Sequence, residues 1–89
     1  MCTTIGNKVA VTGSGKGANG WFHVDEAFVG YDHPFHAQLE HAVLLDFVNQ
    51  ATSTKARLAI ELNRESAREL ANQILAVLDE ADAYEGTRS

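Results

Sequence analysis

Residues 55–78, KARLAIELNRESARELANQILAVL, decide the fold, because the spacing of the apolar residues changes within this stretch. Up to Leu62 every second residue is apolar, which is the period of a β-strand with one face on the core. After Asn63 the apolar residues recur at intervals of three and four, which is the period of an amphipathic helix, with Arg64 and Arg68 expected on its solvent side. The apolar stripe consists of Ala67, Leu70, Ala71, Ile74, Val77, Leu78 and Ala81. Asparagine is a common helix N-cap, so the helix is predicted to begin at this residue.

Three further strands are predicted ahead of this stretch. Residues 5–12 and 41–48 alternate between apolar and polar side chains. Residues 21–33 alternate with a change of phase near Asp25, where an inserted residue is expected. The glycine-rich segment 13–20 is predicted to be a hairpin loop between the first two strands. The fold class is therefore α+β, a four-stranded antiparallel sheet with one C-terminal helix packed on one face.

The chain is short and has the composition of a globular domain. It has 89 residues, of which 45% are apolar and 21% are charged. Residues 1–85 are predicted to form a single domain, and 86–89 a frayed tail. Because so small a domain buries a limited core, a homodimer is expected. The subunit contact is predicted on the sheet face opposite the helix, which carries Trp21 or Phe28, Ala42, Leu44 and Val48.

Charge and hydropathy argue against two classes of partner. The net charge is −5 at pH 7, with two lysines against five acids in residues 1–50 and five basic against seven acidic residues in 51–89. No basic patch is available for a nucleic-acid backbone. No apolar run of membrane-spanning length and no signal segment is found, so no membrane partner is expected. The single cysteine, Cys2, excludes an intramolecular disulfide, and a cytoplasmic location is expected.

The densest group of chemically useful side chains is DHPFHAQLEH, residues 32–41, which holds three of the four histidines. Imidazoles at two strand ends and in the loop between them can converge on a transition metal, and histidine suits Zn, Cu, Fe or Ni. Asp32 and Glu40 bracket the loop and are expected to accept hydrogen bonds from the imidazoles. The predicted metal ligands are His33, His36, His41 and Cys2. The main prediction is a protein that binds a transition metal or a small ligand there.

The expected strand pairing brings Cys2 to the histidines. Pairing Val9 with Val24 in the first hairpin continues the ladder until Cys2 lies beside the end of the second strand. Pairing Val43 with Ile60 in the second hairpin places the start of the helix at the same end of the sheet. Cys2, the three histidines and the helix N-terminus are therefore expected to lie together, although a slip of one residue would exchange the faces.

Other interpretations of the same residues stay open. The histidines can be structural, with His41 bonded to backbone at the edge of the core, or can act in acid–base catalysis without a metal. Cys2 can be a nucleophile with His33 or His36 as its base, near the positive end of the helix, in a small metabolite enzyme. A third function class is a protein-interaction module that uses the exposed sheet face. The residues leave open whether the protein is an enzyme.

Two motifs carry a resemblance that covers nearly the whole chain. GSGKGANGWF, residues 13–22, precedes DHPFHAQLEH, and the chain closes with a strand and a helix. In this order the motifs resemble a family of small bacterial proteins of unknown function. The resemblance implies a bacterial, cytoplasmic protein and assigns no role to any residue.

Overall fold

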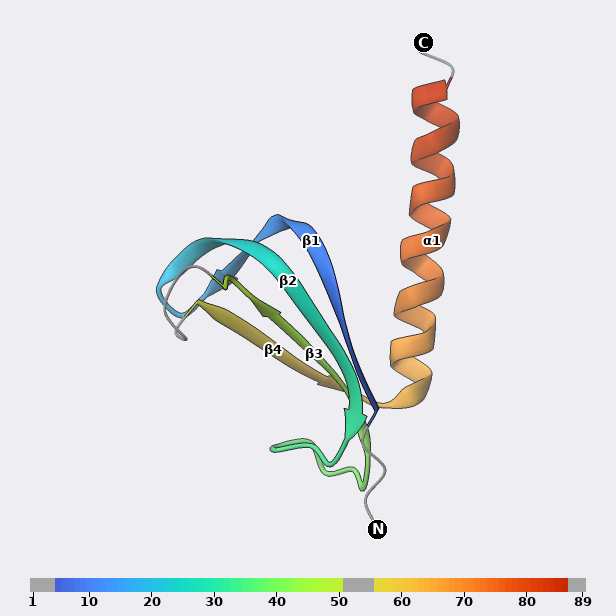
Figure 1. Ribbon diagram of the computed structural model, residues 1–89. Helices are drawn as coiled ribbons and strands as arrows, with labels where there is room; N and C mark the ends of the chain where they lie inside the picture. The colour runs from blue at the N-terminus through green and yellow to red at the C-terminus, as the bar shows by residue number, and fades with distance from the viewer. Residues whose placement is uncertain (1–4, 51–55, 87–89) are drawn as a thin grey trace.

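A computed structural model describes residues 5–50 and 56–86 and has an α+β fold. The elements are β1 (Ile5–Gly17), β2 (Gly20–Asp32), β3 (Ala42–Val48), β4 (Arg57–Leu62) and α1 (Arg64–Gly86). The strands form one antiparallel sheet in the order β1-β2-β3-β4, and α1 follows β4 directly (Figure 1). The predicted fold class is confirmed. Of the predicted tail, 86–89, only Gly86 is described, and it ends α1.

The first hairpin has a shorter turn than predicted. Residues 13–17 belong to β1, and only Ala18 and Asn19 form the turn. Gly20 follows the turn with a φ of +105°, a backbone conformation that glycine adopts without strain. The prediction of a loop over residues 13–20 is wrong, because most of its glycines pair in the β1–β2 ladder instead of turning the chain.

The shorter turn also changes how β1 pairs with β2. Val9 lies opposite Ala27, three positions beyond the expected partner, Val24. An irregularity is present at Asp25, but the extra residue lies in β1 and not in the second strand as expected, since Val11 and Thr12 stand against Asp25 alone. It keeps Val24 and Ala27 on one side of the sheet, where both are buried.

The second hairpin differs from the expected register by two residues. Val43 lies opposite Leu62 and not opposite Ile60. A shift of two keeps each side chain on its predicted face, because successive side chains of a strand alternate between the faces. We call the face directed toward α1 the inner face and the opposite one the outer face. The inner face carries Ile5, Val29, Tyr31, Val43, Leu45 and Leu62.

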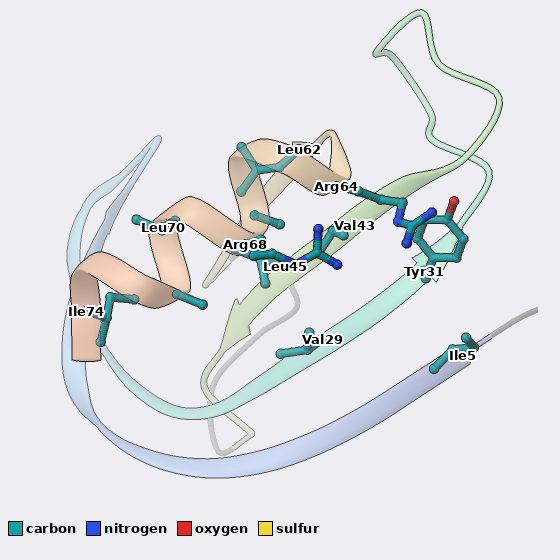
Figure 2. A pocket seen from close by; sticks show the side chains of 12 residues that line it. Ile5, Val29, Tyr31, Val43, Leu45, Leu62, Arg64, Arg68, Leu70 and Ile74 are labelled. Carbon is teal, nitrogen blue, oxygen red and sulfur yellow. The ribbon is translucent and has the colours of Figure 1, made fainter. Parts of the chain in front are cut away.

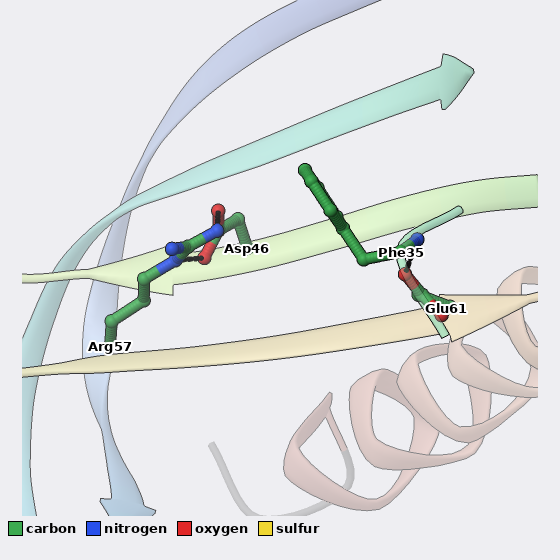
Figure 3. Close-up of polar contacts among 4 residues, drawn as sticks. All are labelled: Phe35, Asp46, Arg57 and Glu61. Atoms are coloured by element: carbon green, nitrogen blue, oxygen red, sulfur yellow. Dashed lines mark hydrogen bonds and ion pairs between the residues drawn. The ribbon is translucent and has the colours of Figure 1, made fainter. Parts of the chain in front are cut away.

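Several side chains of the outer face make specific contacts within the chain. The Phe28 ring lies over two glycines: a Cβ atom would be 2.5 Å from Phe28 Cζ at Gly6 and 2.8 Å from Phe28 Cε1 at Gly30. Arg57 donates two hydrogen bonds to the Asp46 carboxylate, at 2.7 and 2.6 Å (Figure 3). These hydrogen bonds and the charge of Asp46 raise the pKa of Arg57.

The helix is well capped but poorly covered. The predicted cap is confirmed, since Asn63 Oδ1 accepts a hydrogen bond of 2.8 Å from the backbone N–H of Ser66. From its start next to β4, α1 stands away from the inner face (Figure 1), and none of its residues is buried. The buried apolar residues in the described part of the chain are Val24, Ala27 and Ala42. No helix there is long and apolar enough to cross a bilayer.

Candidate functional site

A cleft of about 720 Å³ separates the inner face of the sheet from α1 (Figure 2). The sheet wall is formed by the six inner-face residues defined above. The helix wall is formed by Arg64, Ala67, Arg68, Leu70, Ala71 and Ile74. The apolar members of this wall belong to the stripe predicted from the sequence. The cleft is therefore the place where the apolar surfaces of the sheet and the helix face each other.

The walls of the cleft are largely apolar and incompletely covered, and Tyr31, Val43, Leu45 and Leu62 are half-buried. Ile5 and Val29 on the sheet are 52% and 39% exposed, and Leu70 and Ile74 on the helix are 45% and 53% exposed. Large side chains of this type are normally covered in a folded protein, and contiguous exposed apolar surface commonly marks an interaction site.

Arg64 and Arg68 supply the positive charge of the cleft. Their position beside the apolar stripe suggests the solvent side of the helix, but both line the cleft, and Figure 2 shows them over the sheet. The reason is that α1 stands off the sheet, so the flank of the helix borders the cleft along with the stripe. Neither arginine forms an ion pair with any residue that the structure describes.

The histidine segment, residues 33–41, lies beyond the end of the sheet at which α1 begins. It contains a stack of aromatic rings. The rings of His33 and His41 have centroids 4.5 Å apart, and the Tyr31 ring lies 5.4 Å from that of His41. His33 Nδ1 lies 2.8 Å from the Glu40 carbonyl oxygen. Because a carbonyl only accepts, Nδ1 is the donor, which in the neutral ring leaves the lone pair on Nε2. The structure therefore brings His33 and His41 together.

The middle of the segment is held by a carboxylate on β4. Glu61 accepts a hydrogen bond of 2.6 Å from the backbone N–H of Phe35 (Figure 3). It also accepts hydrogen bonds of 3.1 and 2.8 Å from the backbone N–H groups of His36 and Ala37. The hydrogen bonds from Ala37 and then Phe35 contribute most to lowering the pKa of Glu61. His36 is thus positioned through its backbone, and its side chain is exposed.

The predicted metal ligands are brought together only in part. Among residues 5–50 and 56–86, no group of three or more His, Cys, Asp and Glu side chains is arranged to hold a metal ion. Cys2, the fourth predicted ligand and the predicted nucleophile, lies outside the described residues. Asp32 accepts a hydrogen bond of 2.7 Å from the backbone N–H of His33, and Glu40 contacts that imidazole through its carbonyl. The metal-binding and catalytic roles of these residues stay predictions.

Two residues of this region carry no sequence signal for their roles. Glu61 occupies a polar position of an alternating strand, and its partners Phe35 and Ala37 are 26 and 24 residues away. Tyr31 belongs to the apolar alternation of β2, which predicts a core position and not a ring stack. Both contacts depend on how β2 and β4 flank β3 in the sheet.

The chain belongs to DUF6295, a family of unknown function, whose model matches residues 1–87. The resemblance to a family of unknown function is therefore confirmed. Comparison with curated proteins and with solved structures gives no match.

Proposed function

We propose that this member of DUF6295 is a protein-interaction module that works as a homodimer, with the cleft as the subunit contact. The observation that carries the proposal is the exposed area of the single chain. Its accessible surface is 7001 Å². A folded monomer of 9.7 kDa is expected to expose roughly 5,100 Å². The excess of roughly 1,900 Å² is more than the roughly 800 Å² that each partner buries in a standard interface.

The dimensions of the chain support the same conclusion. Its radius of gyration is 15.4 Å. A compact domain of 89 residues is expected to have a radius of gyration of roughly 12 Å. The difference arises because α1 stands away from the sheet instead of lying against it (Figure 1). A partner in the cleft would restore a compact particle.

The energetics of the helix also favour a partner. Helices in proteins gain most of their stability from packing an apolar face, and α1 has no buried residue. Full burial of side chains such as Leu70 and Ile74 is worth about 1.5–3 kcal/mol each. Every copy of the chain has the same uncovered helix and the same uncovered sheet. A single two-fold contact between two copies therefore covers both surfaces at once.

The outer face is a weaker candidate for this contact, although the sequence pattern favours it. Ala42 is already buried there, and Phe28 packs over Gly6 and Gly30. The inner face, by contrast, keeps Ile5 and Val29 exposed beside an equally exposed helix.

Sedimentation equilibrium of the full chain, purified without a tag, tests the proposal. The wild type is expected to have twice the mass of 9.7 kDa, and its unfolding temperature is expected to rise with protein concentration. Ile74→Glu, in the cleft, is expected to dissociate the dimer. Asn72→Glu, on the helix but outside the cleft lining, is the matched control and is expected to remain dimeric. A monomeric wild type with a concentration-independent unfolding temperature would overturn the proposal.

We also propose, as a second function, that His33 and His41 bind a transition metal ion. The supporting observation is the ring pair with centroids 4.5 Å apart, together with the His33 tautomer that the Glu40 carbonyl selects. A metal-bound imidazole commonly donates its other N–H to a backbone carbonyl in this way. His36 and Cys2 are the predicted further ligands.

Calorimetric titration of tag-free protein with Zn²⁺ and Cu²⁺ tests this second proposal. His33→Ala and His41→Ala are each expected to abolish binding. His23→Ala is the control, because His23 lies on β2 opposite Ser14, near the far end of the sheet, and is expected to leave binding unchanged. Equal binding by all three variants, or no binding by the wild type, would contradict the metal site. A metal-free protein whose Cys2 is alkylated much faster than a free thiol would favour the enzyme interpretation instead.

A further inference from the structure

We propose that the two α1 helices of the dimer lie antiparallel between the two sheets, with Arg64 and Arg68 of each copy beside Asp82 and Asp79 of the other. The inference rests on the homodimer proposed above and adds the orientation and register of its helices. The distribution of charge along α1, the flank on which the charges lie and the apolar stripe support it.

The two halves of α1 differ in charge. The first half carries Arg64 and Arg68 together with two acids, Glu65 and Glu69. The second half, from Ile74 onward, carries four acids and no basic residue. These acids lie toward the negative end of the helix dipole, where negative charge is unfavourable. Positive charge from outside the helix, placed beside Asp79 and Asp82, would therefore stabilise the second half.

The charges that fit each other lie on one flank of the helix. At about 100° per residue, Arg64, Arg68, Asp79 and Asp82 fall within about 60° of one another around the axis, next to the apolar stripe. Both arginines line the cleft, so this flank borders it. Asp79 and Asp82 are exposed and form no ion pair with the described residues.

Two-fold symmetry and the positions of these charges together indicate how the two helices are oriented. A two-fold axis between antiparallel helices keeps the same flank of both helices on one side and reverses the residue order. Arg64 then falls opposite the partner's Asp82, and Arg68 falls opposite the partner's Asp79. The midpoints of both pairs lie within one residue of Ile74. A parallel pair would instead place the acidic halves side by side, which is unfavourable.

The apolar stripe is compatible with the register that the charges indicate. With the axis near Ile74, this side chain meets its own copy in the partner. Leu70 then faces the partner's Leu78, and Ala67 faces the partner's Ala81. All of these residues belong to the stripe predicted from the sequence. The charged and the apolar residues can thus be matched in registers that agree within two residues, which favours a second copy of this chain over an unrelated partner.

The register has a consequence for the histidine segments. The two helix N-termini would be about 28 Å apart along the helix axis, at about 1.5 Å per residue. Each N-terminus follows β4 of its own copy, close to its own His33 and His41. The dimer would therefore carry two separate histidine pairs at opposite ends, and no metal ion could be shared between the copies.

Charge exchange between two variants tests the inference by sedimentation equilibrium. Arg64→Glu/Arg68→Glu and Asp79→Arg/Asp82→Arg are each expected to weaken self-association at least about tenfold, or about 1.4 kcal/mol. An equimolar mixture of the two, and the variant with all four substitutions, are expected to recover wild-type affinity because opposite charges face each other again. The differences between the variants should diminish at high salt.

Glu65→Arg/Glu69→Arg, which changes the side of α1 opposite the apolar stripe, is the matched control and is expected to leave self-association unchanged. A wild-type dimer whose two charge variants associate as tightly as the wild type, or are not rescued by mixing, overturns the antiparallel register. A wild-type monomer overturns the homodimer itself, so the two failures are distinguishable. Circular dichroism of each variant shows whether it is folded.

Discussion

The two faces of the sheet differ in how completely one chain covers them. On the outer face, Phe28 packs over two glycines, Asp46 pairs with Arg57, and Glu61 holds the histidine segment. On the inner face, apolar side chains of the sheet and of α1 line a cleft and remain exposed. The outer face is thus stabilised by contacts within the chain. On the inner side Val24 and Ala27 are buried, whereas the part beside α1 has the surface of an unformed interface.

The largest expected effect is on dimer affinity, and it shows which face of the sheet forms the subunit contact. Leu44 and Leu45 are neighbours on β3 that point to opposite faces, and only Leu45 lines the cleft. Leu45→Asp is expected to raise the dimer Kd at least about a hundredfold, or about 2.7 kcal/mol, because its carboxylate would be buried without a partner. Leu44→Asp is expected to remain dimeric. Light scattering measures both masses, and the reverse pattern would place the contact on the outer face.

The next effect tests how tightly the outer face is packed. Gly30→Ala places a Cβ 2.8 Å from Phe28 Cε1 and 3.0 Å from the Ile5 carbonyl oxygen. This overpacking is expected to cost about 1–3 kcal/mol, which lowers the unfolding temperature by about 4–8 °C per kcal/mol. Gly13→Ala is the control, because a Cβ there has no neighbour within 4 Å. Equal unfolding temperatures for the two variants would show that Phe28 does not pack over Gly30.

A smaller effect is expected for the ion pair on the outer face. Arg57 and Asp46 are 53% and 22% exposed, so solvent screens their attraction. A double-mutant cycle with Arg57→Gln and Asp46→Asn is expected to give a coupling of about 0.2–1 kcal/mol in the free energy of unfolding. A coupling of several kcal/mol would indicate that the pair is covered by a partner, and hence that the outer face belongs to the contact.

The smallest effect on global stability is expected at Glu61, whose carboxylate is solvent-exposed. Its folded pKa is lowered below the ordinary value of 4.5, so its stabilising contribution is present above that pH and is lost as the pH falls through the folded pKa. Glu61→Gln is expected to remove the contribution at neutral pH. Hydrogen exchange at Phe35–Ala37 measures the effect, and unchanged protection in the variant would refute the role of the carboxylate.

Local sequence patterns predicted the strands and the helix. The strand register depends on contacts between distant residues and was predicted less well. The change of period at Asn63 placed the end of β4 and the cap of α1 correctly. The register of β3 with β4 was wrong by two residues, but the faces were correct, because side-chain direction depends only on alternation. The loop over residues 13–20 was predicted wrongly, since alternating glycines are compatible with both a turn and a strand.

Contacts within one loop of the candidate site were predictable from the sequence, whereas contacts between distant segments were not. His33 and His41 were expected to lie near each other, because a single short loop joins the ends of β2 and β3. The anchoring of that loop by Glu61 was not, because residues some 25 positions apart in the chain make no shared local pattern. The cleft position of Arg64 and Arg68 was missed because it depends on the angle between α1 and the sheet.

The sequence by itself determined which residues form strands, where the helix starts and which side chains share a face, because these follow from the periods of backbone geometry. Only the tertiary structure decided how far α1 stands from the inner face, and thus that a cleft exists between them. That separation depends on packing between elements distant in the chain. An amphipathic pattern specifies that a face will be covered, but the covering surface need not belong to the same copy.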